Sequence, residues 1–219
     1  MSDKYRYVYI DNPKTGCTSL KSALLELELR DTSTTFELSN FRFIHGWASL
    51  PIWPNRTLTN LVAQGFKFFS FVRNPYTRLV SCYLNKFENS TRPNRYITTC
   101  LPNKKPPENF AAFVHQITLQ QNHKMNPHWR PQVANLTFSA IPYTFIGRFE
   151  NYAKDFALTF ATIGVNQIDA PALRHLNQSQ RNGRGMGDFY DKELQELVYQ
   201  RYLADFETFG YDPALPERD

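Results

Sequence analysis

The feature that most constrains the fold is the run Lys67–Val72 (KFFSFV), which is apolar at nearly every position. Such a run is typical of a strand buried on both faces of a parallel sheet. It is followed by Arg73 and by two residues that suit the start of a helix, because Asn74 is a favoured N-cap and Pro75 fits the first helical position. The run therefore predicts a strand, a tight loop and a helix in succession.

The beginning of the chain predicts a second unit of this kind. Residues 5–10 (YRYVYI) are rich in strand-forming side chains and stop at a turn cluster, residues 11–13. After Gly16, apolar residues recur at the spacing of one helical face: Leu20, Ala23, Leu24 and Leu27. Two such units favour an α/β fold of three layers, in which helices flank a mostly parallel central sheet. We expect residues 1–219 to form a single domain of this type.

The remaining elements follow from the same patterns. Four are predicted with ordinary lengths, namely strands at 41–44 and 143–146 and helices at 108–117 and 151–163. Residues 191–209 are strongly amphipathic and predict one long helix that Gly210 ends. Residues 88–107 are rich in proline and polar side chains, so we expect a long surface loop there.

Charge and cysteine content exclude several function classes. The formal net charge of +5 suits an anionic ligand, but the basic residues are dispersed, which argues against a nucleic-acid partner. Cys17, Cys82 and Cys100 show no C-x-x-C spacing, so neither a disulfide framework nor a zinc ribbon is indicated, and no metal site is expected. Without a signal-peptide pattern or an apolar run of about 18 residues, we expect a cytoplasmic protein that does not span a membrane. The oligomeric state does not follow from the sequence.

The loop of residues 13–19 (PKTGCTS) has the features of an anion site. Ligands of parallel sheets bind beyond the carboxyl ends of the strands, where this loop lies. Successive backbone N–H groups at a helix N-terminus bind phosphate or sulfate. Gly16 allows a close backbone approach, Lys14 adds a cation, and three residues add hydroxyl groups: Thr15, Thr18 and Ser19.

Two better-known phosphate loops do not fit these residues. A Walker A loop needs its lysine directly after the second glycine, whereas Lys14 precedes Gly16. A cysteine phosphatase loop needs an arginine six residues after its cysteine, and position 23 is Ala23. We therefore interpret Cys17 as a small loop residue rather than a nucleophile.

The second motif is residues 72–83 (VRNPYTRLVSCY). Arg73 closes the buried strand, so its guanidinium is expected to face the ligand crevice. Ser81 lies about two helical turns further on and returns to roughly the same side. An arginine fork and a hydroxyl group are suitable partners for a terminal phosphate dianion.

Together these motifs resemble those of the sulfotransferases that use 3′-phosphoadenosine-5′-phosphosulfate (PAPS). The resemblance is to sulfotransferase family 2, the carbohydrate branch with the chondroitin, HNK-1 and heparan 2-O enzymes. Three further stretches are similar to that branch in the same order: 126–132 (NPHWRPQ), 145–150 (FIGRFE) and 202–211 (YLADFETFGY). The resemblance implies a P-loop-like sulfotransferase fold and PAPS as donor, with 3′,5′-adenosine bisphosphate as product and no metal.

The resemblance also implies roles for individual residues. The 5′-phosphosulfate is expected at the first loop, formed by Lys14, Thr15, Gly16, Cys17, Thr18 and Ser19. Arg73 and Ser81 are expected to bind the 3′-phosphate. Arg181 falls where the family has a loop that closes over the nucleotide, so it is a further candidate for the 3′-phosphate.

Sulfuryl transfer needs a base for the acceptor hydroxyl, and two histidines are candidates. His45 follows the predicted strand 41–44, where the heparan 2-O enzymes have an H-G-H stretch, although the second histidine is Trp47 here. His128 of the HW-x-P-Q stretch is the rival, and Glu88 is a third candidate. In this mechanism Lys14 neutralises charge on the transferred group.

The acceptor is expected to be a glycan because of the family resemblance. Tryptophans and basic side chains suit sugar stacking and acidic glycans, or else core packing and solvated surface: Trp47, Trp53, Trp129, Arg92, Arg95, Lys104 and Lys105. Two other functions remain open from the residues alone. One is a P-loop-like nucleotide kinase or hydrolase, and the other is a non-catalytic nucleotide- or glycan-binding module.

Overall fold

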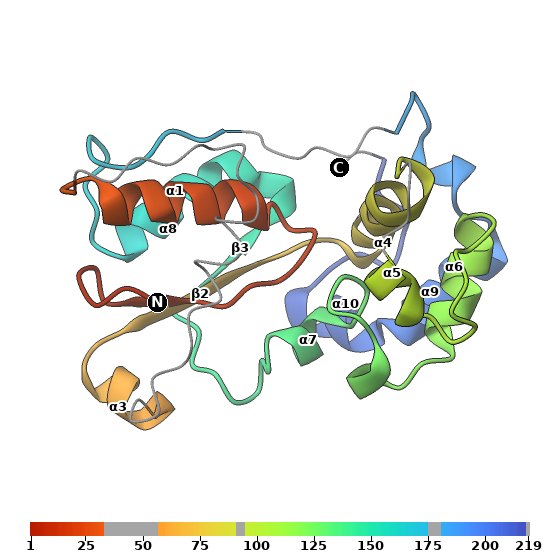
Figure 1. Cartoon of the computed structure of the whole chain (residues 1–219), viewed down its shortest axis with the longest axis horizontal. Coiled ribbons are helices and arrows are strands. Elements are labelled where there is room, and N and C mark those ends of the chain that lie inside the picture. Colours follow the sequence, from red (N-terminus) through yellow and green to blue (C-terminus); the bar gives the residue numbers. More distant parts are fainter. Residues whose placement is uncertain (33–56, 91–94, 175–180, 218–219) are drawn as a thin grey trace. The chain divides into compact units, whose positions relative to one another are not determined.

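Figure 1 shows a computed structural model of the chain, which describes residues 1–32, 57–90, 95–174 and 181–217. The chain folds into two compact units. The first contains residues 1–11, 15–71 and 138–177, and the second contains residues 12–14, 72–137 and 178–219. The single domain expected for residues 1–219 stays a prediction. The strand expected at residues 41–44 lies outside the described residues.

Among the described residues, the first unit is built on a sheet of three strands. Its strands lie in the order β1 (Tyr7–Tyr9), β2 (Lys67–Val72) and β3 (Phe145–Arg148). β1 and β2 are parallel, and the N–H of Ile10 extends their pairing by donating to the carbonyl of Phe69 at 3.0 Å. The hydroxyl of Ser70 returns a hydrogen bond to the carbonyl of Ile10 at 2.7 Å, so the polar residue inside the apolar run is satisfied.

Helices cover both faces of this sheet. They are α1 (Cys17–Leu29), α3 (Leu58–Ala63) and α8 (Tyr152–Thr162). Phe69 and Phe71 of β2 pack with the apolar faces of α1 and α8, which lie on one side of the sheet in Figure 1. Phe68 points the other way and packs with Leu61 of α3. The predicted α/β fold with a helix-flanked parallel sheet is therefore confirmed, and β2 is buried on both faces as expected.

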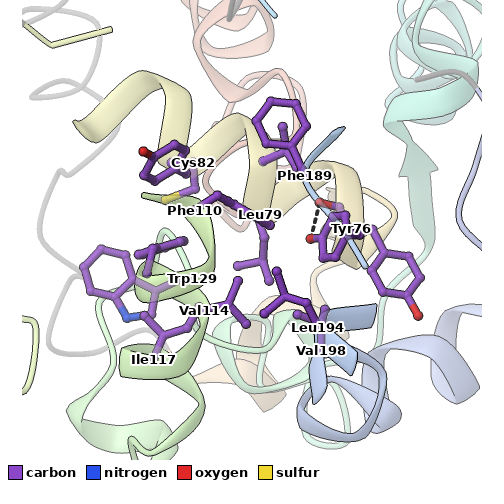
Figure 2. Packing of buried hydrophobic residues seen from close by; sticks show 14 of the residues in the cluster. Tyr76, Leu79, Cys82, Phe110, Val114, Ile117, Trp129, Phe189, Leu194 and Val198 are labelled. Carbon is purple, nitrogen blue, oxygen red and sulfur yellow. Dashed lines mark hydrogen bonds between the residues drawn. The ribbon is translucent and has the colours of Figure 1, made fainter. Parts of the chain in front are cut away.

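The second unit is helical. Its α-helices are α4 (Pro75–Tyr83), α5 (Arg95–Thr99), α6 (Phe110–Thr118), α7 (Gln132–Asn135), α9 (Lys192–Arg201) and α10 (Leu203–Phe209). α4 continues into a short π-helical segment, Leu84–Glu88. One apolar cluster joins α4, α6 and α9, and Figure 2 shows Trp129 within it beside Val114 and Ile117 of α6. Trp129 is fully buried, so it is a core residue and not a surface for sugar stacking.

Two predictions about this unit need correction. Residues 88–107 are more than a surface loop, because they contain α5 and bury Ile97 and Leu101 in the core. The single helix expected at residues 191–209 is divided into α9 and α10 at Tyr202, whose φ of −111° and ψ of 18° are not helical. The side chain explains the break, since the hydroxyl of Tyr202 donates to the carbonyl of Trp129.

In the part of the chain that the structure describes, no helix is both long enough and apolar enough to cross a bilayer. All three cysteines are described, and none forms a disulfide in this structure.

Gly147 of β3 provides a test of the packing beneath α1 and α8. A Cβ atom at this position would lie 2.5 Å from Cε1 of Phe71, and that ring is fully buried. We expect Gly147→Ala to lower the free energy of unfolding by about 1–3 kcal/mol, as overpacked cores do. Urea denaturation measures the change. Gly187→Ala is the matched control, because nothing lies within 4 Å of its added Cβ, and an equal loss in both variants would contradict the expectation.

Candidate functional site

The loop after β1 requires glycine at position 16 for two reasons. Gly16 has a φ of 77° and caps the N-terminus of α1, a left-handed conformation that glycine adopts without steric cost. A Cβ atom there would also lie 2.5 Å from the ring of Tyr152. The hydroxyl of Tyr152 donates to the carbonyl of Gly16 at 2.7 Å, which holds the ring in this place.

The N-terminus of α1 has the electrostatics of an anion site. The helix has 13 residues and begins at Cys17, directly after Gly16. Its first N–H groups have no partners within the helix, and its dipole is positive at this end. No acidic side chain lies in the first turn to compete with an anion. Three predicted ligands, Thr15, Thr18 and Ser19, are buried, whereas Cys17 is half-buried.

A further cation on α1 was not singled out from the sequence. Lys21 is only 4% exposed and forms a salt bridge with Asp11, at the start of the same loop. The pairing satisfies the buried ammonium group and ties α1 to the end of β1.

Two of the predicted cationic residues, Arg73 and Lys14, are in contact within the second unit. Arg73 follows β2 directly and is 5% exposed. Its Nη1 donates to the backbone carbonyl of Lys14 at 3.1 Å, and its Nε donates to Oγ1 of Thr77 at 3.0 Å. The guanidinium therefore links the two candidate motifs.

The beginning of α4 places Thr77 and Ser81 on one helical face. Asn74 caps this helix as predicted, and its Oδ1 accepts from the N–H of Tyr76 at 2.9 Å. Thr77 and Ser81 are four residues apart, so they are neighbours on the helix surface. Ser81 is buried. Thr77 thus extends the predicted pair of Arg73 and Ser81 to a row of three polar side chains.

The side chain of Gln132 holds the backbone of Arg73. Its Oε1 accepts from the N–H of Arg73 at 3.0 Å, and its Nε2 donates to the carbonyl of Arg73 at 2.7 Å. The same Oε1 accepts from Nδ2 of Asn12 at 2.9 Å. Because Gln132 is fully buried, its amide continues the hydrogen bonding at the end of β2 as a neighbouring strand would.

Asp205 of α10 positions Gln132 in turn. Its two carboxylate oxygens accept from the backbone N–H groups of Gln132, at 2.8 Å, and Val133, at 2.9 Å. These are the first residues of α7, where a helix favours a negative charge. Burial raises the pKa of Asp205, and the two hydrogen bonds together with the charge of Arg78 oppose that rise. The break between α9 and α10 therefore has a clear use, because α10 presents this carboxylate.

Arg78 binds three loop carbonyls with one guanidinium. Nε donates to Pro13 at 3.0 Å, Nη1 to Arg130 at 2.9 Å and Nη2 to Pro127 at 2.8 Å. Burial lowers the pKa of Arg78, and the negative charge of Asp205 opposes that effect. Pro13 directly precedes Lys14, and Pro127 directly precedes His128. One buried side chain thus positions both loops.

The other predicted site residues have different surroundings. Arg181 is half-buried; burial raises the pKa of the Tyr190 hydroxyl, and Arg181 is near enough to oppose that rise. Both carboxylate oxygens of Glu88 accept from Arg184, which gives this third candidate base a structural partner. His45 lies outside the described residues. No group of three or more metal-ligating side chains is found in residues 1–32, 57–90, 95–174 and 181–217, and the absence of a metal stays a prediction.

The chain matches a known protein family. The model of the sulfotransferase family matches residues 1–212, which is nearly the whole chain. The chain belongs to this family. Arg78, Gln132 and Asp205 all lie in the stretches that carry the resemblance, but sequence spacing assigns no role to them.

Curated relatives are carbohydrate sulfotransferases. Carbohydrate sulfotransferase 14 of Danio rerio is 27% identical over 236 residues, which cover 96% of this chain and 61% of the relative. Carbohydrate sulfotransferase 12 of Xenopus laevis is 24% identical, with 96% and 59% covered, and carbohydrate sulfotransferase 9 of Homo sapiens is 27% identical, with 96% and 52% covered. The chain spans about half to three-fifths of the length of these relatives. No solved structure matches it.

The fork of Arg78 can be tested without removing its charge. Arg78→Lys keeps the cation, but an ammonium group lacks the planar fork, so buried carbonyls lose their partners. We expect the free energy of unfolding to fall by about 2–3 kcal/mol in urea denaturation. Arg30→Lys, at an exposed arginine after α1, should change it by less than about 0.5 kcal/mol. Equal effects would mean that the three hydrogen bonds contribute nothing specific.

Proposed function

We propose that this protein is a sulfotransferase that moves a sulfuryl group from PAPS to a hydroxyl group of a carbohydrate. Membership of the family supports sulfuryl transfer, and the names of the relatives support a carbohydrate acceptor. The observation that carries the proposal is the contact between Arg73 and Lys14. It gathers two cationic residues at the carboxyl end of β2, where ligands of parallel sheets bind.

We assign the two ends of the donor to different residues. The 5′-phosphosulfate is assigned to Lys14, Thr15, Gly16, Cys17, Thr18 and Ser19, which carry the helix N-terminus and the lysine. The 3′-phosphate is assigned to Arg73 and Ser81, with Thr77 between them and Arg181 as a further candidate. The backbone of Arg73 is held by Gln132, and its guanidinium is held by Thr77 and the carbonyl of Lys14. A side chain positioned in this way loses less entropy when it binds the donor.

The reaction needs charge stabilisation and alignment more than covalent help. The acceptor oxygen forms a bond to sulfur while the bond from sulfur to the bridging phosphate oxygen breaks. Lys14 stabilises the negative charge that remains on the phosphate. The proton of the acceptor hydroxyl passes to a base, and the products are a sulfate ester and 3′,5′-adenosine bisphosphate.

We assign the base to His128. It is half-buried, and its loop is held through Pro127 to the guanidinium that also holds Pro13, next to Lys14. This supports a position near the lysine that handles the transferred group. His45, the first candidate from the sequence, stays a prediction because it lies outside the described residues.

The donor assignment predicts selective nucleotide binding. We expect 3′,5′-adenosine bisphosphate to bind much more tightly than ADP, which lacks a 3′-phosphate. Arg73→Ala should weaken bisphosphate binding by about 30-fold or more and leave ADP nearly unaffected. Isothermal titration calorimetry measures both ligands. Arg30→Ala, which removes the same charge from a surface pair with Asp169, is the control. Equal affinities for the two nucleotides would instead favour a kinase or hydrolase.

The base assignment predicts a loss of turnover. His128→Ala should lower kcat by about 10²–10⁴-fold and leave bisphosphate affinity within about twofold of the parent protein. Transfer of labelled sulfate from PAPS to a panel of desulfated glycans measures kcat. His45→Ala is assayed in parallel. If His45→Ala loses turnover while His128→Ala keeps it, the base is His45, and if neither variant nor the parent transfers sulfate, the chain is a binding module.

A further inference from the structure

The ring of His128 is hydrogen-bonded to a neighbouring side chain. Oδ1 of Asn126 lies 3.0 Å from the backbone nitrogen of His128 and 2.7 Å from its Nδ1. Asn126 is 4% exposed, so the residue that accepts both contacts is buried, whereas His128 is half-buried. Two nitrogen atoms of one residue therefore share a single oxygen atom.

The shared contact fixes which ring nitrogen carries hydrogen. A backbone N–H only donates, so the atom of Asn126 that it meets is the amide oxygen and not the amide nitrogen. An amide oxygen only accepts, so Nδ1 of His128 must donate to it. A neutral imidazole carries one hydrogen, and Nε2 is therefore the nitrogen with the basic lone pair.

The residues around this contact hold Asn126 in place. Its backbone carbonyl accepts from the N–H groups of Trp129, at 3.0 Å, and Arg130, at 2.9 Å. The intervening Pro127 has a fixed φ, and its carbonyl accepts from Arg78 and from Nδ2 of Asn135, both at 2.8 Å. The turn from Asn126 to Arg130 is thus held by hydrogen bonds within the protein.

The same turn lies close to the loop of Lys14. Nε and Nη2 of Arg78 belong to one planar guanidinium, and they bind the carbonyls of Pro13 and Pro127. The residues that follow these two prolines, Lys14 and His128, start from carbonyls held by the same group. The backbone segments that lead into Lys14 and His128 are therefore held by one side chain.

We propose that Asn126 is a positioning residue for sulfuryl transfer. It holds His128 in the Nδ1–H tautomer, so that Nε2 takes the proton of the acceptor hydroxyl as the oxygen bonds to sulfur and the bond to the bridging phosphate oxygen breaks. This inference rests on the proposed function. The choice of tautomer has a large effect on catalysis. An enzyme whose catalytic histidine is held in the wrong tautomer loses up to about 10⁴-fold in kcat.

The first experiment reads the tautomer directly and needs no activity. Nitrogen-15 NMR of the ring distinguishes protonated from unprotonated nitrogen, and the His128 signals are assigned by their absence in His128→Ala. At a pH where the ring is neutral, we expect hydrogen on Nδ1 in the parent protein. We expect the same in Asn126→Asp, because its carboxylate also accepts a hydrogen bond from Nδ1. Asn126→Ala should show a mixture of tautomers. The exposed His115 and His123 are internal references that should not change.

The second experiment measures kcat of the same variants at a pH where the ring is neutral. Asn126→Ala should lose about 10- to 100-fold in kcat with bisphosphate affinity unchanged, and Asn126→Asp should recover most of it. Asn109→Ala is the matched control, because it removes another asparagine acceptor, the cap of α6, from the same unit. An equal loss of kcat in Asn109→Ala would mean that the loss in Asn126→Ala comes from lower stability and not from the position of His128.

The outcomes separate this inference from the proposed function. An Nε2–H tautomer in the parent protein, or no tautomer change in Asn126→Ala, overturns the role of Asn126 even if the protein transfers sulfate. If the tautomer behaves as expected but the parent protein transfers no sulfate, the proposed function fails instead. Asn126→Asp keeps the test decisive should Asn126→Ala not fold.

Discussion

The loops of the second unit depend on the buried guanidinium of Arg78. Removing a charge from water costs several kcal/mol unless hydrogen bonds replace the lost hydration. Arg78 meets this requirement with three backbone carbonyls from two loops that have little secondary structure of their own. The dependence runs both ways, since the carbonyls need the donor as much as the charge needs acceptors. Packing alone does not give such loops a single conformation, whereas a planar fork with three fixed directions does.

Local patterns predicted much of the first unit. The run KFFSFV became β2 over the same residues, and the spacing of Leu20, Ala23, Leu24 and Leu27 correctly gave the buried face of α1. The start of α4 was also predictable, because Asn74 and Pro75 act within one helical turn. These successes share a cause: each depends on side chains that are close in sequence, where the periodicity of strands and helices is informative.

Polar contacts between residues far apart in sequence could not be predicted from local patterns. Gln132 bonds with Arg73 across 59 positions and with Asn12 across 120, and no spacing rule connects residues so far apart. The division of the expected long helix at Tyr202 has the same origin, because its hydroxyl reaches Trp129. The amphipathic pattern of residues 191–209 correctly predicted apolar residues that are buried, such as Leu194 and Phe206. It did not predict the backbone conformation at Tyr202, where the tertiary hydrogen bond forms. Motifs predict Arg73 and Ser81, and helical spacing places Thr77 on the same face between them.

The amide of Gln132 has a consequence for what this position tolerates. It accepts on one atom and donates on the other, and both are used by the backbone of Arg73. A glutamate has the same shape, but it could make both hydrogen bonds only as the neutral acid, since an ionised carboxylate would face the carbonyl of Arg73 with no hydrogen between them. The backbone conformation of Arg73 would then depend on pH. Glutamine frees the end of β2 from that dependence, because an amide does not titrate.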